Sequence, residues 1–519
     1  MKRIILKYFL NINIINLKIM GKILLTGVDY MSEKNNYIIP GIVCTLLAVC
    51  VSMLFMTDSF RKDEANADNS SFRHSETIHN TTYKFPGGED KMYLKEITLD
   101  DKSFLQDEYK YNHQLAKASL ALSLSAFTSD DGKSHWGDDG NFNRDINIKQ
   151  VLSDLKFEKS EVYGYDVNLN DSSSKVAFAL GHKTLNNGDK SFDVVCVAVR
   201  GGGYGCEWAD NFRLGSDQSS FHKGFFDSAQ KIVPKLDDYI KRRCKGENVK
   251  LWITGYSRGG AVANILASLY DSEKENNGCS VFAYTFASPA TADISNDDNV
   301  KYSNIFNIIN PYDIVPTIPP SQWGFSRFGV DLYFPMYDEQ NELFSKVSSY
   351  YTDITGVNKE LFKESPLKSV TDIIVKIGKD RKTYASLLQP VLEDLVLSSM
   401  TREKIDGKWT VIPFKKYVRQ KYGAEIASEI DSIEKNIGVT GVGDITITLP
   451  RDFVKFLTLC KINGVGDIST AISESMTLGT AHEIAGLGGE SIFSGSVSGH
   501  FPEVYLAWME TIGENEFVK

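Results

Sequence analysis

Cysteine and histidine are both scarce in this chain, which has 7 cysteines and 8 histidines among 519 residues. Cys44 and Cys50 lie in an apolar N-terminal segment, and the remaining odd number of cysteines shows no paired spacing. The spacing therefore predicts neither a disulfide framework nor a zinc site. The acidic stretches 129–143 and 166–171 lack a complete calcium-loop pattern, so we expect no metal and no organic cofactor.

Basic residues are also fewer than acidic ones. The chain has 57 Lys and Arg against 67 Asp and Glu, a net charge of −10. Because no stretch forms a concentrated basic surface, the sequence argues against nucleic acid as a partner. The hydrophobic fraction of 42% and the charged fraction of 24% are globular values. The length fits one large enzyme domain with an insertion, or two to three units.

One long hydrophobic run is present, because residues 37–56 are uncharged and almost wholly apolar. About 20 apolar residues are enough to cross a bilayer as a helix. The basic residues before this run are Lys2, Arg3, Lys7, Lys18, Lys22 and Lys34. By the positive-inside rule the N-terminus faces the cytoplasm and the rest of the chain lies outside, so we predict membrane attachment through this segment.

The sequence leaves the processing of this region open. Charged residues separate the apolar run from a small-residue site at Ala67, which favours an uncleaved anchor in the cell membrane over a secreted, cleaved protein. Translation could begin at Met1 or at Met31. We assign residues 1–67 to an export and membrane-anchor region, and the polar residues 68–91 to a linker.

Strands and helices alternate between residues 92 and 321. Strands are expected at 176–181, 192–199, 251–254, 281–287 and 305–309, and helices at 104–127 and 225–243. This alternation predicts an α/β fold with a mainly parallel sheet and helices on its faces. Residues 322–476 show helical patterns without strand alternation, which predicts an inserted helical cap. Residues 477–519 are expected to return to the core.

The most informative motif lies in residues 251–264, where an apolar strand ends in Gly-x-Ser-x-Gly and a small-residue helix follows. Such a nucleophile elbow sets a serine in a sharp turn whose flanking positions must be very small. Gly255 and Gly259 meet that demand on either side of Ser257. The motif and its strand-to-helix context predict Ser257 as a nucleophile.

A serine nucleophile needs a histidine to take its proton and a carboxylate to orient that histidine. In folds with this elbow the chain order is Ser, then Asp or Glu, then His. After Ser257 only His482 and His500 remain, and we favour His500 because it lies in a loop that opens a C-terminal helix. Asp313, just past the expected strand 305–309, is the predicted carboxylate.

The transition state also requires two backbone N–H groups that bind the oxyanion. One comes from the residue after the nucleophile, which is Arg258, and the other from an earlier loop at a strand end. The glycines that follow residue 199 allow a close backbone approach, so Gly202 or Gly201 is expected to supply the second group. We take Gly202 and Arg258 as the predicted oxyanion hole.

Several motifs, in order, resemble those of the class 3 (fungal-type) lipases. The matching segments are T-G-Y-S-R-G-G-A at 254–261, V-A-V-R-G-G at 197–202, E-W-A-D-N at 207–211, F-H-K-G-F at 221–225, T-F-A-S-P at 285–289, D-I-V-P at 313–316 and His500 with Tyr505. The resemblance implies an α/β-hydrolase core, a Ser257–Asp313–His500 triad, a structural His222 and acylglycerol substrates. It covers about residues 104–322 and the last 40 or so.

The chain departs from the family pattern at Tyr256, where histidine is usual, at Arg258, where leucine is usual, and at Gly202, where a hydroxyl residue is usual. We expect Arg258 to pair with Glu207 or Asp210, with contact to an anionic substrate as the alternative. The sequence thus predicts a serine ester hydrolase of the lipase type. A phospholipase or another acyl esterase is the alternative among enzymes, and a non-catalytic envelope binding protein is the alternative outside them.

Overall fold

The structure is a computed structural model that describes residues 77–87, 91–127, 145–165, 176–187, 190–202, 205–215, 220–245, 248–272, 279–294, 300–363, 380–406, 408–437, 439–442, 445–448, 451–464 and 498–519. The expected anchor segment 37–56 and the candidate base His482 lie outside these residues. Among the helices in the described ranges, none combines the length and apolar character that a bilayer crossing requires.

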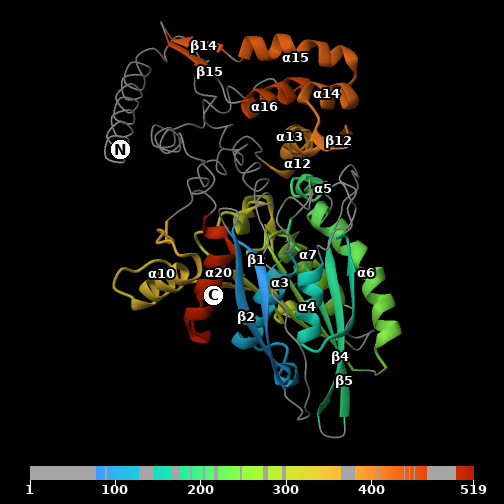
Figure 1. Cartoon of the computed structure of the whole chain (residues 1–519), viewed down its shortest axis with the longest axis vertical. Helices are drawn as coiled ribbons and strands as arrows, with labels where there is room; N and C mark the ends of the chain where they lie inside the picture. The colour runs from blue at the N-terminus through green and yellow to red at the C-terminus, as the bar shows by residue number, and fades with distance from the viewer. Residues whose placement is uncertain are drawn as a thin grey trace.

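The core is built on a seven-stranded sheet with the strand order β11-β9-β7-β6-β5-β4-β3 (Figure 1). The strands are β3 (Glu158–Tyr163), β4 (Phe178–Asn187), β5 (Lys190–Val199), β6 (Val249–Tyr256), β7 (Cys279–Phe286), β9 (Ile305–Ile309) and β11 (Val330–Tyr333). Neighbouring strands from β5 to β11 pair in parallel, whereas β4 pairs antiparallel with both β3 and β5. The prediction of an α/β fold with a mainly parallel sheet is confirmed.

The two faces of the sheet bury alternate residues of each strand, as the two-residue period of a strand requires. On β5, Val194, Cys196 and Ala198 face one hydrophobic cluster, and Val195, Val197 and Val199 face the other. Strands buried on both faces read as continuous apolar runs. This is why β5, β6 and β7 could be predicted from composition alone.

Helices cover both faces of the sheet (Figure 1). On the first face lie α3 (His113–Ser125), α4 (Ile146–Asp154) and α20 (Pro502–Thr511). On the second face lie α6 (Lys223–Arg243) and α7 (Arg258–Ser272). Asn112 caps the start of α3, because its side chain accepts from the N–H of Leu115 at 3.0 Å and so satisfies an orphan donor of the first turn. The helix predicted at 104–127 is therefore shorter, with a 3-10 turn at Asp101–Leu105 before it.

The first described element is a hairpin of β1 (Ile78–Pro86) and β2 (Met92–Asp100), paired antiparallel along its length. Its buried side chains, Tyr83, Phe85, Ile97 and Leu99, join the cluster under α3 and α4. The predicted linker 68–91 is therefore wrong from residue 78 onward. Polar residues dominate this stretch because only one face of the hairpin is buried, which leaves alternate positions free to be hydrophilic.

The region read as a cap contains α10 (Glu342–Thr355), α12 (Arg381–Leu387), α13 (Gln389–Met400), α14 (Phe414–Tyr422), α15 (Ala424–Ile437) and α16 (Arg451–Ile462). Two short hairpins interrupt them, β12 (Arg402–Ile405) with β13 (Lys408–Val411) and β14 (Val439–Val442) with β15 (Ile445–Thr448). Helix α13 packs on α5 (Gly205–Asp210), and Figure 1 shows α13 to α16 gathered beyond that end of the core.

The predicted start of this insertion at residue 322 is wrong, because β11 at 330–333 still belongs to the central sheet, parallel to β9. Helix α10 also packs against α20 at the core rather than with α13 to α16. A four-residue strand at a sheet edge offers too short an apolar run to be recognised in a sequence. The other predicted domain boundaries stay predictions.

Candidate active site

Ser257 occupies the turn between β6 and α7 and has a backbone φ of +57°. Non-glycine residues adopt a positive φ at a cost, which persists only where the surroundings impose it. Here its N–H donates to the carbonyl of Phe286 at 2.9 Å, and its carbonyl accepts from Ala261 N–H at 3.1 Å. The turn therefore fixes the serine at the carboxyl end of the sheet, with its side chain partly exposed.

The two glycines of the motif are required by close backbone contacts. A Cβ at Gly255 would lie 2.1 Å from the carbonyl oxygen of Gly259, and a Cβ at Gly259 would lie 2.4 Å from that of Val199. Both distances are far below van der Waals contact, so no larger residue fits without displacing backbone. This geometry is the strand-turn-helix context that the sequence motif predicts.

The structure brings Asp313 and His500 to Ser257 from distant parts of the chain. The Nε2 atom of His500 lies 2.9 Å from the Oγ of Ser257, and its Nδ1 lies 2.7 Å from Oδ2 of Asp313. Asp313 follows β9 and has a fully buried side chain, whereas the His500 side chain is 9% exposed. The three side chains form a hydrogen-bonded chain that can move a proton from a serine hydroxyl to an imidazole.

Two tyrosines hold this chain in place. The hydroxyl of Tyr505, on α20, donates to Oδ2 of Asp313 at 2.9 Å and accepts from the N–H of Asn310 at 3.0 Å. The hydroxyl of Tyr256 donates to the backbone carbonyl of His500 at 2.6 Å. Burial, and next the charge of Asp313, raises the pKa of both phenols well above 10. Both hydroxyls therefore stay protonated and act as donors.

The loops that carry Asp313 and His500 are also joined directly. The side-chain amide of Asn310 donates to the carbonyl of Gly499 at 2.8 Å. A Cβ at Gly499 would lie 2.3 Å from the carbonyl oxygen of Tyr312, so only glycine permits this approach. Sequence reasoning missed Asn310 and Gly499, because nothing in the motifs indicated that these two loops touch.

The predicted oxyanion donors flank the elbow. Val199, at the end of β5, pairs in register with Gly255, so Gly201 and Gly202 continue the chain alongside Ser257. Arg258 is the first residue of α7, and N–H groups in a first helical turn have no acceptor within the helix. The arrangement can place two backbone donors beside a reacting carbonyl, and the assignment of Gly202 and Arg258 stays a prediction.

The side chain of Arg258 points into the core and is 3% exposed. Its guanidinium donates to Asn211 Oδ1 at 2.9 Å and to Ser228 Oγ at 2.7 Å, with Asp210 Oδ2 at 3.5 Å. The expected pairing of Arg258 with an acid is therefore confirmed for Asp210, while Glu207 pairs with Arg200 at 3.2 Å. Its positive charge is therefore compensated within the core by a buried carboxylate.

His222 takes no part in the Ser257 contacts. It is fully buried, its ring stacks on Phe225, and its Nε2 lies 3.2 Å from the carbonyl of Asn211. Burial is the main cause that lowers the pKa of His222 from 6.5 to about 3, so the ring stays neutral above that pH. A buried, stacked and neutral histidine is consistent with the structural role that the family resemblance implies for His222.

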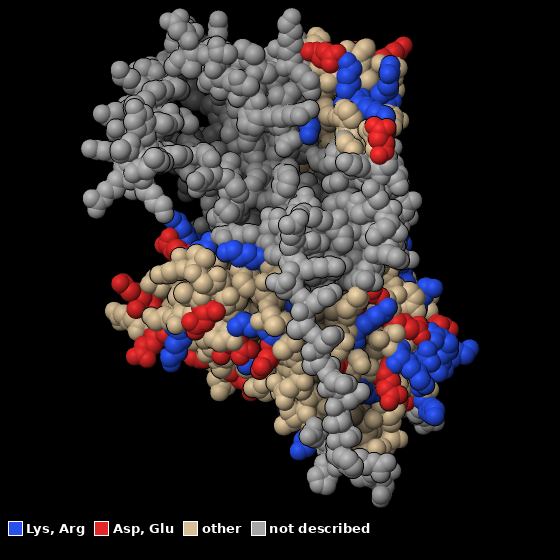
Figure 2. All heavy atoms as spheres, viewed as in Figure 1, with Lys and Arg blue, Asp and Glu red and all other residues tan. Residues whose placement is uncertain are grey.

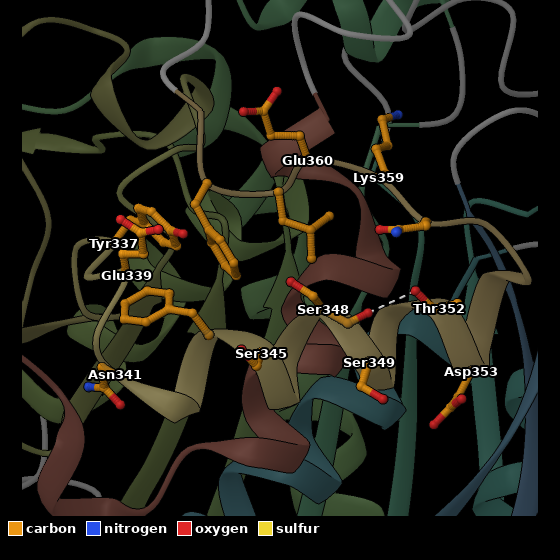
Figure 3. A pocket seen from close by; sticks show the side chains of 14 residues that line it. Tyr337, Glu339, Asn341, Ser345, Ser348, Ser349, Thr352, Asp353, Lys359 and Glu360 are labelled. Atoms are coloured by element: carbon orange, nitrogen blue, oxygen red, sulfur yellow. Dashed lines mark hydrogen bonds between the residues drawn. The ribbon is translucent and has the colours of Figure 1, made fainter.

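A cavity of about 680 Å³ lies between α10 and the segment 358–362 (Figure 3). Hydroxyl side chains of α10 form one wall, among them Ser345, Ser348 and Thr352, and Lys359 and Glu360 lie across from them. None of its lining residues belongs to the Ser257 chain of hydrogen bonds. The cavity thus does not include Ser257, Asp313 or His500 in its lining.

Charge on the surface is mixed rather than concentrated. On the face drawn in Figure 2, Lys and Arg lie among Asp and Glu over the part of the core that the structure describes. Arg242 and Arg243, near the end of α6, are both paired with Glu161 at 2.8 and 2.9 Å. Among the described residues drawn on this face, basic side chains therefore lie beside acidic ones.

Comparison with known proteins identifies a family over part of the chain. Residues 196–323 match the model of the family described as lipase (class 3). A curated lipase of Rhizomucor miehei is 32% identical over 116 residues, which are 22% of this chain and 32% of that lipase. The chain thus matches about a third of the length of this relative. The resemblance predicted from the motifs is confirmed over these residues.

Solved structures of fungal lipases are also similar to the chain. The Rhizomucor miehei lipase propeptide complex is 20% identical, with a TM-score of 0.29, and the match covers 43% of this chain and 70% of that one. The mono- and diacylglycerol lipase of Aspergillus oryzae is 18% identical, with a TM-score of 0.29, and the match covers 45% and 83%. We therefore assign the α/β-hydrolase core from the sheet order, the elbow and the family match, and not from these structural similarities, whose TM-scores are low.

Proposed function

We propose that the protein is a serine ester hydrolase acting on acyl esters of lipids, acylglycerols above all, on the premise that residues 196–323 match the class 3 lipase family. The observation that carries the proposal is the hydrogen-bonded chain from Asp313 through His500 to Ser257 at a strained elbow. Each contact has the length and the direction that the reaction needs.

In the proposed reaction, Ser257 Oγ attacks the acyl carbonyl while His500 Nε2 takes its proton. Asp313 orients the imidazole and stabilises the imidazolium that forms. The N–H groups of Gly202 and Arg258 bind the oxyanion, and His500 then protonates the leaving alcohol. A water molecule, deprotonated by the same histidine, hydrolyses the acyl-enzyme and restores Ser257.

Lipid esters are the proposed substrates because of the family match. The cap, meaning α12 to α16, contacts the segment that follows α5, because Arg381 of α12 donates to the carbonyl of Leu214 at 2.9 Å and Tyr384 donates to that of Phe212 at 3.2 Å. Both carbonyls belong to the segment that follows α5. We propose that the cap controls entry to Ser257.

A phospholipase is the weaker candidate. The sequence feature that favoured it was Arg258, as a cation that could contact a phosphate. Because this guanidinium is buried against Asp210, Asn211 and Ser228, it offers no charge to a head group. We therefore retain no separate phospholipase proposal, and the substrate panel below includes phospholipid as an outcome.

A fluorophosphonate probe, which reacts covalently with activated serines, tests the nucleophile. We expect the wild-type protein to be labelled, Ser257→Ala to remain unlabelled, and His500→Ala to be labelled at least 100-fold more slowly. His482→Ala is the matched control and should be labelled at the wild-type rate. An unlabelled wild-type protein would support a non-catalytic binding protein, and equal loss in both histidine variants would remove the assignment of the base.

A substrate panel tests the lipid assignment. Purified protein is assayed on long-chain triacylglycerol and diacylglycerol emulsions, on phosphatidylcholine vesicles and on short water-soluble esters, with Ser257→Ala as the blank. We expect the acylglycerol emulsions to be hydrolysed. Activity confined to short soluble esters would reject the lipase proposal but keep the esterase mechanism, and preference for phosphatidylcholine would change the substrate class.

We also propose that the chain is anchored in the cell membrane through residues 37–56, with the catalytic part outside. The support is the uncharged length of this segment and the basic residues before it. Anchored protein should stay with membranes in alkaline carbonate, and a variant that lacks 37–56 should be soluble. Full-length protein in the medium, with an N-terminus near Ala67, would instead demonstrate cleavage and secretion.

A further inference from the structure

Three side chains of the types that bind transition metals meet near the ends of the strands where β5 and β6 begin, opposite the ends that lead to Ser257. His182 lies on β4, Asp193 lies near the start of β5, and Cys244 is the residue at which α6 ends. One ligand atom of each, a ring nitrogen, a carboxylate oxygen and Sγ, lies within 4.8 Å of the other two. The residues come from three elements, so tertiary packing alone brings them together.

The carboxylate of Asp193 is held in a fixed orientation. Its Oδ1 accepts from the hydroxyl of Thr184 at 2.7 Å and lies 2.9 Å from His182 Nε2, and its Oδ2 accepts from Lys245 N–H at 2.9 Å. The side chain of Asp193 is 5% exposed and that of His182 is 13% exposed. Fixed ligands supported by outer hydrogen bonds, with limited access for solvent, are characteristic of protein metal sites.

We propose that His182, Asp193 and Cys244 form a binding site for one zinc ion. A ring nitrogen, a carboxylate oxygen and a thiolate are all ligands of Zn²⁺, at about 2.0–2.3 Å. Two ligands of one tetrahedral zinc ion lie about 3.5 Å apart, so movements of about 1 Å would bring the three atoms into coordination. Water takes the fourth position, which the partly exposed His182 leaves within reach of solvent.

Zinc binding would remove the hydrogen bond between His182 and Asp193 and form three bonds from the protein to the metal. That hydrogen bond gives way to a bond from each residue to the metal, and any proton on the ring nitrogen that binds is exchanged through solvent onto the other ring nitrogen. The thiol of Cys244 loses its proton to solvent as its sulfur binds. Asp193 keeps its contacts with Thr184 and Lys245. One proton is therefore released for each zinc ion bound by the thiol.

The site would connect the β4–β5 hairpin to the end of α6. It lies far from the elbow, because Asp193 precedes Val199 by six residues of extended strand, which span about 20 Å. Zinc at this position would stabilise the folded chain without touching the reacting atoms. The inference does not depend on the proposed hydrolase activity.

A second histidine–aspartate pair in the same protein supplies a matched comparison. His79 Nε2 lies 2.9 Å from Asp101 Oδ2, the same separation as in the His182–Asp193 pair. The metal-type clusters among the described residues do not include His79. Replacement of His79 therefore removes an equivalent hydrogen bond without removing a proposed ligand.

The test uses the purified protein, kept reduced and stripped of metal with a chelator. Zn²⁺ is titrated against a chromophoric competitor, and Co²⁺ is added separately to detect the thiolate-to-cobalt absorption in the near ultraviolet. We expect one zinc ion per chain, with affinity reduced at least 100-fold in Cys244→Ser and in His182→Gln, and wild-type affinity in His79→Gln. The cobalt absorption should be lost in Cys244→Ser even at saturating Co²⁺, whereas His182→Gln should reach it only at higher Co²⁺ concentrations than the wild type.

Thermal unfolding provides a second readout. We expect zinc to raise the Tm of the wild-type protein and of His79→Gln, and to leave the Tm of Cys244→Ser and His182→Gln unchanged. The proposal is overturned if the stripped wild-type protein binds no zinc, or if both ligand variants bind as well as the wild type does. Ester hydrolysis should be equal with and without zinc, so either outcome is independent of the proposed function.

Discussion

Replacement of Gly499 by alanine tests whether the contact between the loops that carry Asp313 and His500 sets the geometry of the candidate triad. The new Cβ would lie 2.3 Å from the carbonyl oxygen of Tyr312, and real Cβ contacts essentially never fall below 3.0 Å. The loops must therefore separate by about 0.7 Å or more at this point. Gly499 and Tyr312 directly precede His500 and Asp313, so the strain falls on both partners of the histidine–aspartate hydrogen bond.

A separation of that size would lengthen the Nδ1–Oδ2 distance from 2.7 Å to beyond the usual limit of about 3.2 Å for a hydrogen bond. The imidazole of His500 would then lose its fixed orientation toward Ser257. Misplacement of a catalytic group by about 1 Å costs on the order of 100-fold in rate. We expect kcat to fall between about 10- and 100-fold, with a smaller change in KM.

The assay is steady-state hydrolysis of a short chromogenic ester, combined with titration of reactive serine by a fluorophosphonate and with urea unfolding. Gly356→Ala is the control, because a Cβ there meets nothing within 4 Å while φ is +71°. It should cost about 1 kcal/mol of stability from backbone strain and leave kcat unchanged. A Gly499→Ala protein with kcat within twofold of the wild type would refute the argument.

Three further substitutions have defined expectations. Tyr505→Phe removes a donor to Asp313 and an acceptor for Asn310, and should cost about 2–3 kcal/mol of stability with slower turnover, measured by urea unfolding and kinetics. Arg258→Met leaves Asp210 without one of its cations, so stability should fall by about 3 kcal/mol without a change in head-group preference on the substrate panel. Because the unfolded chain protonates His222 below pH 6.5 and the folded chain only near pH 3, stability is lost as the pH falls through this range, by about 1.4 kcal/mol per unit. His222→Gln should therefore lose about 2 kcal/mol less than the wild type between pH 6.5 and pH 5, and parallel urea-midpoint curves would contradict this.

Local patterns in the sequence were sufficient for much of the core. The strand expected at 305–309 matches β9, and the strands through 192–199, 251–254 and 281–287 match β5, β6 and β7 with small differences at their ends. These strands are buried on both faces, so their apolar runs are uninterrupted. The β1–β2 hairpin and β11 were missed because one is buried on a single face and the other is only four residues long.

The residues of the candidate site also separate into those that local sequence patterns predict and those that they do not. Ser257, Asp313 and His500 could be predicted because a nucleophile elbow has a local motif and the fold imposes the order of its partners. The support from Asn310, Gly499 and Tyr256 could not, because each acts on a loop that is distant in the sequence.

The sequence alone was sufficient for the strands buried on both faces, the elbow and the candidate triad, since each depends on residues that are neighbours or on a fixed chain order. Only the tertiary structure decided that the cation of Arg258 faces a buried aspartate, and that His182, Asp193 and Cys244 lie within reach of one metal ion. The physical reason is that side-chain direction and the meeting of distant segments are fixed by packing. Packing is a property of the whole core and not of any stretch of chain.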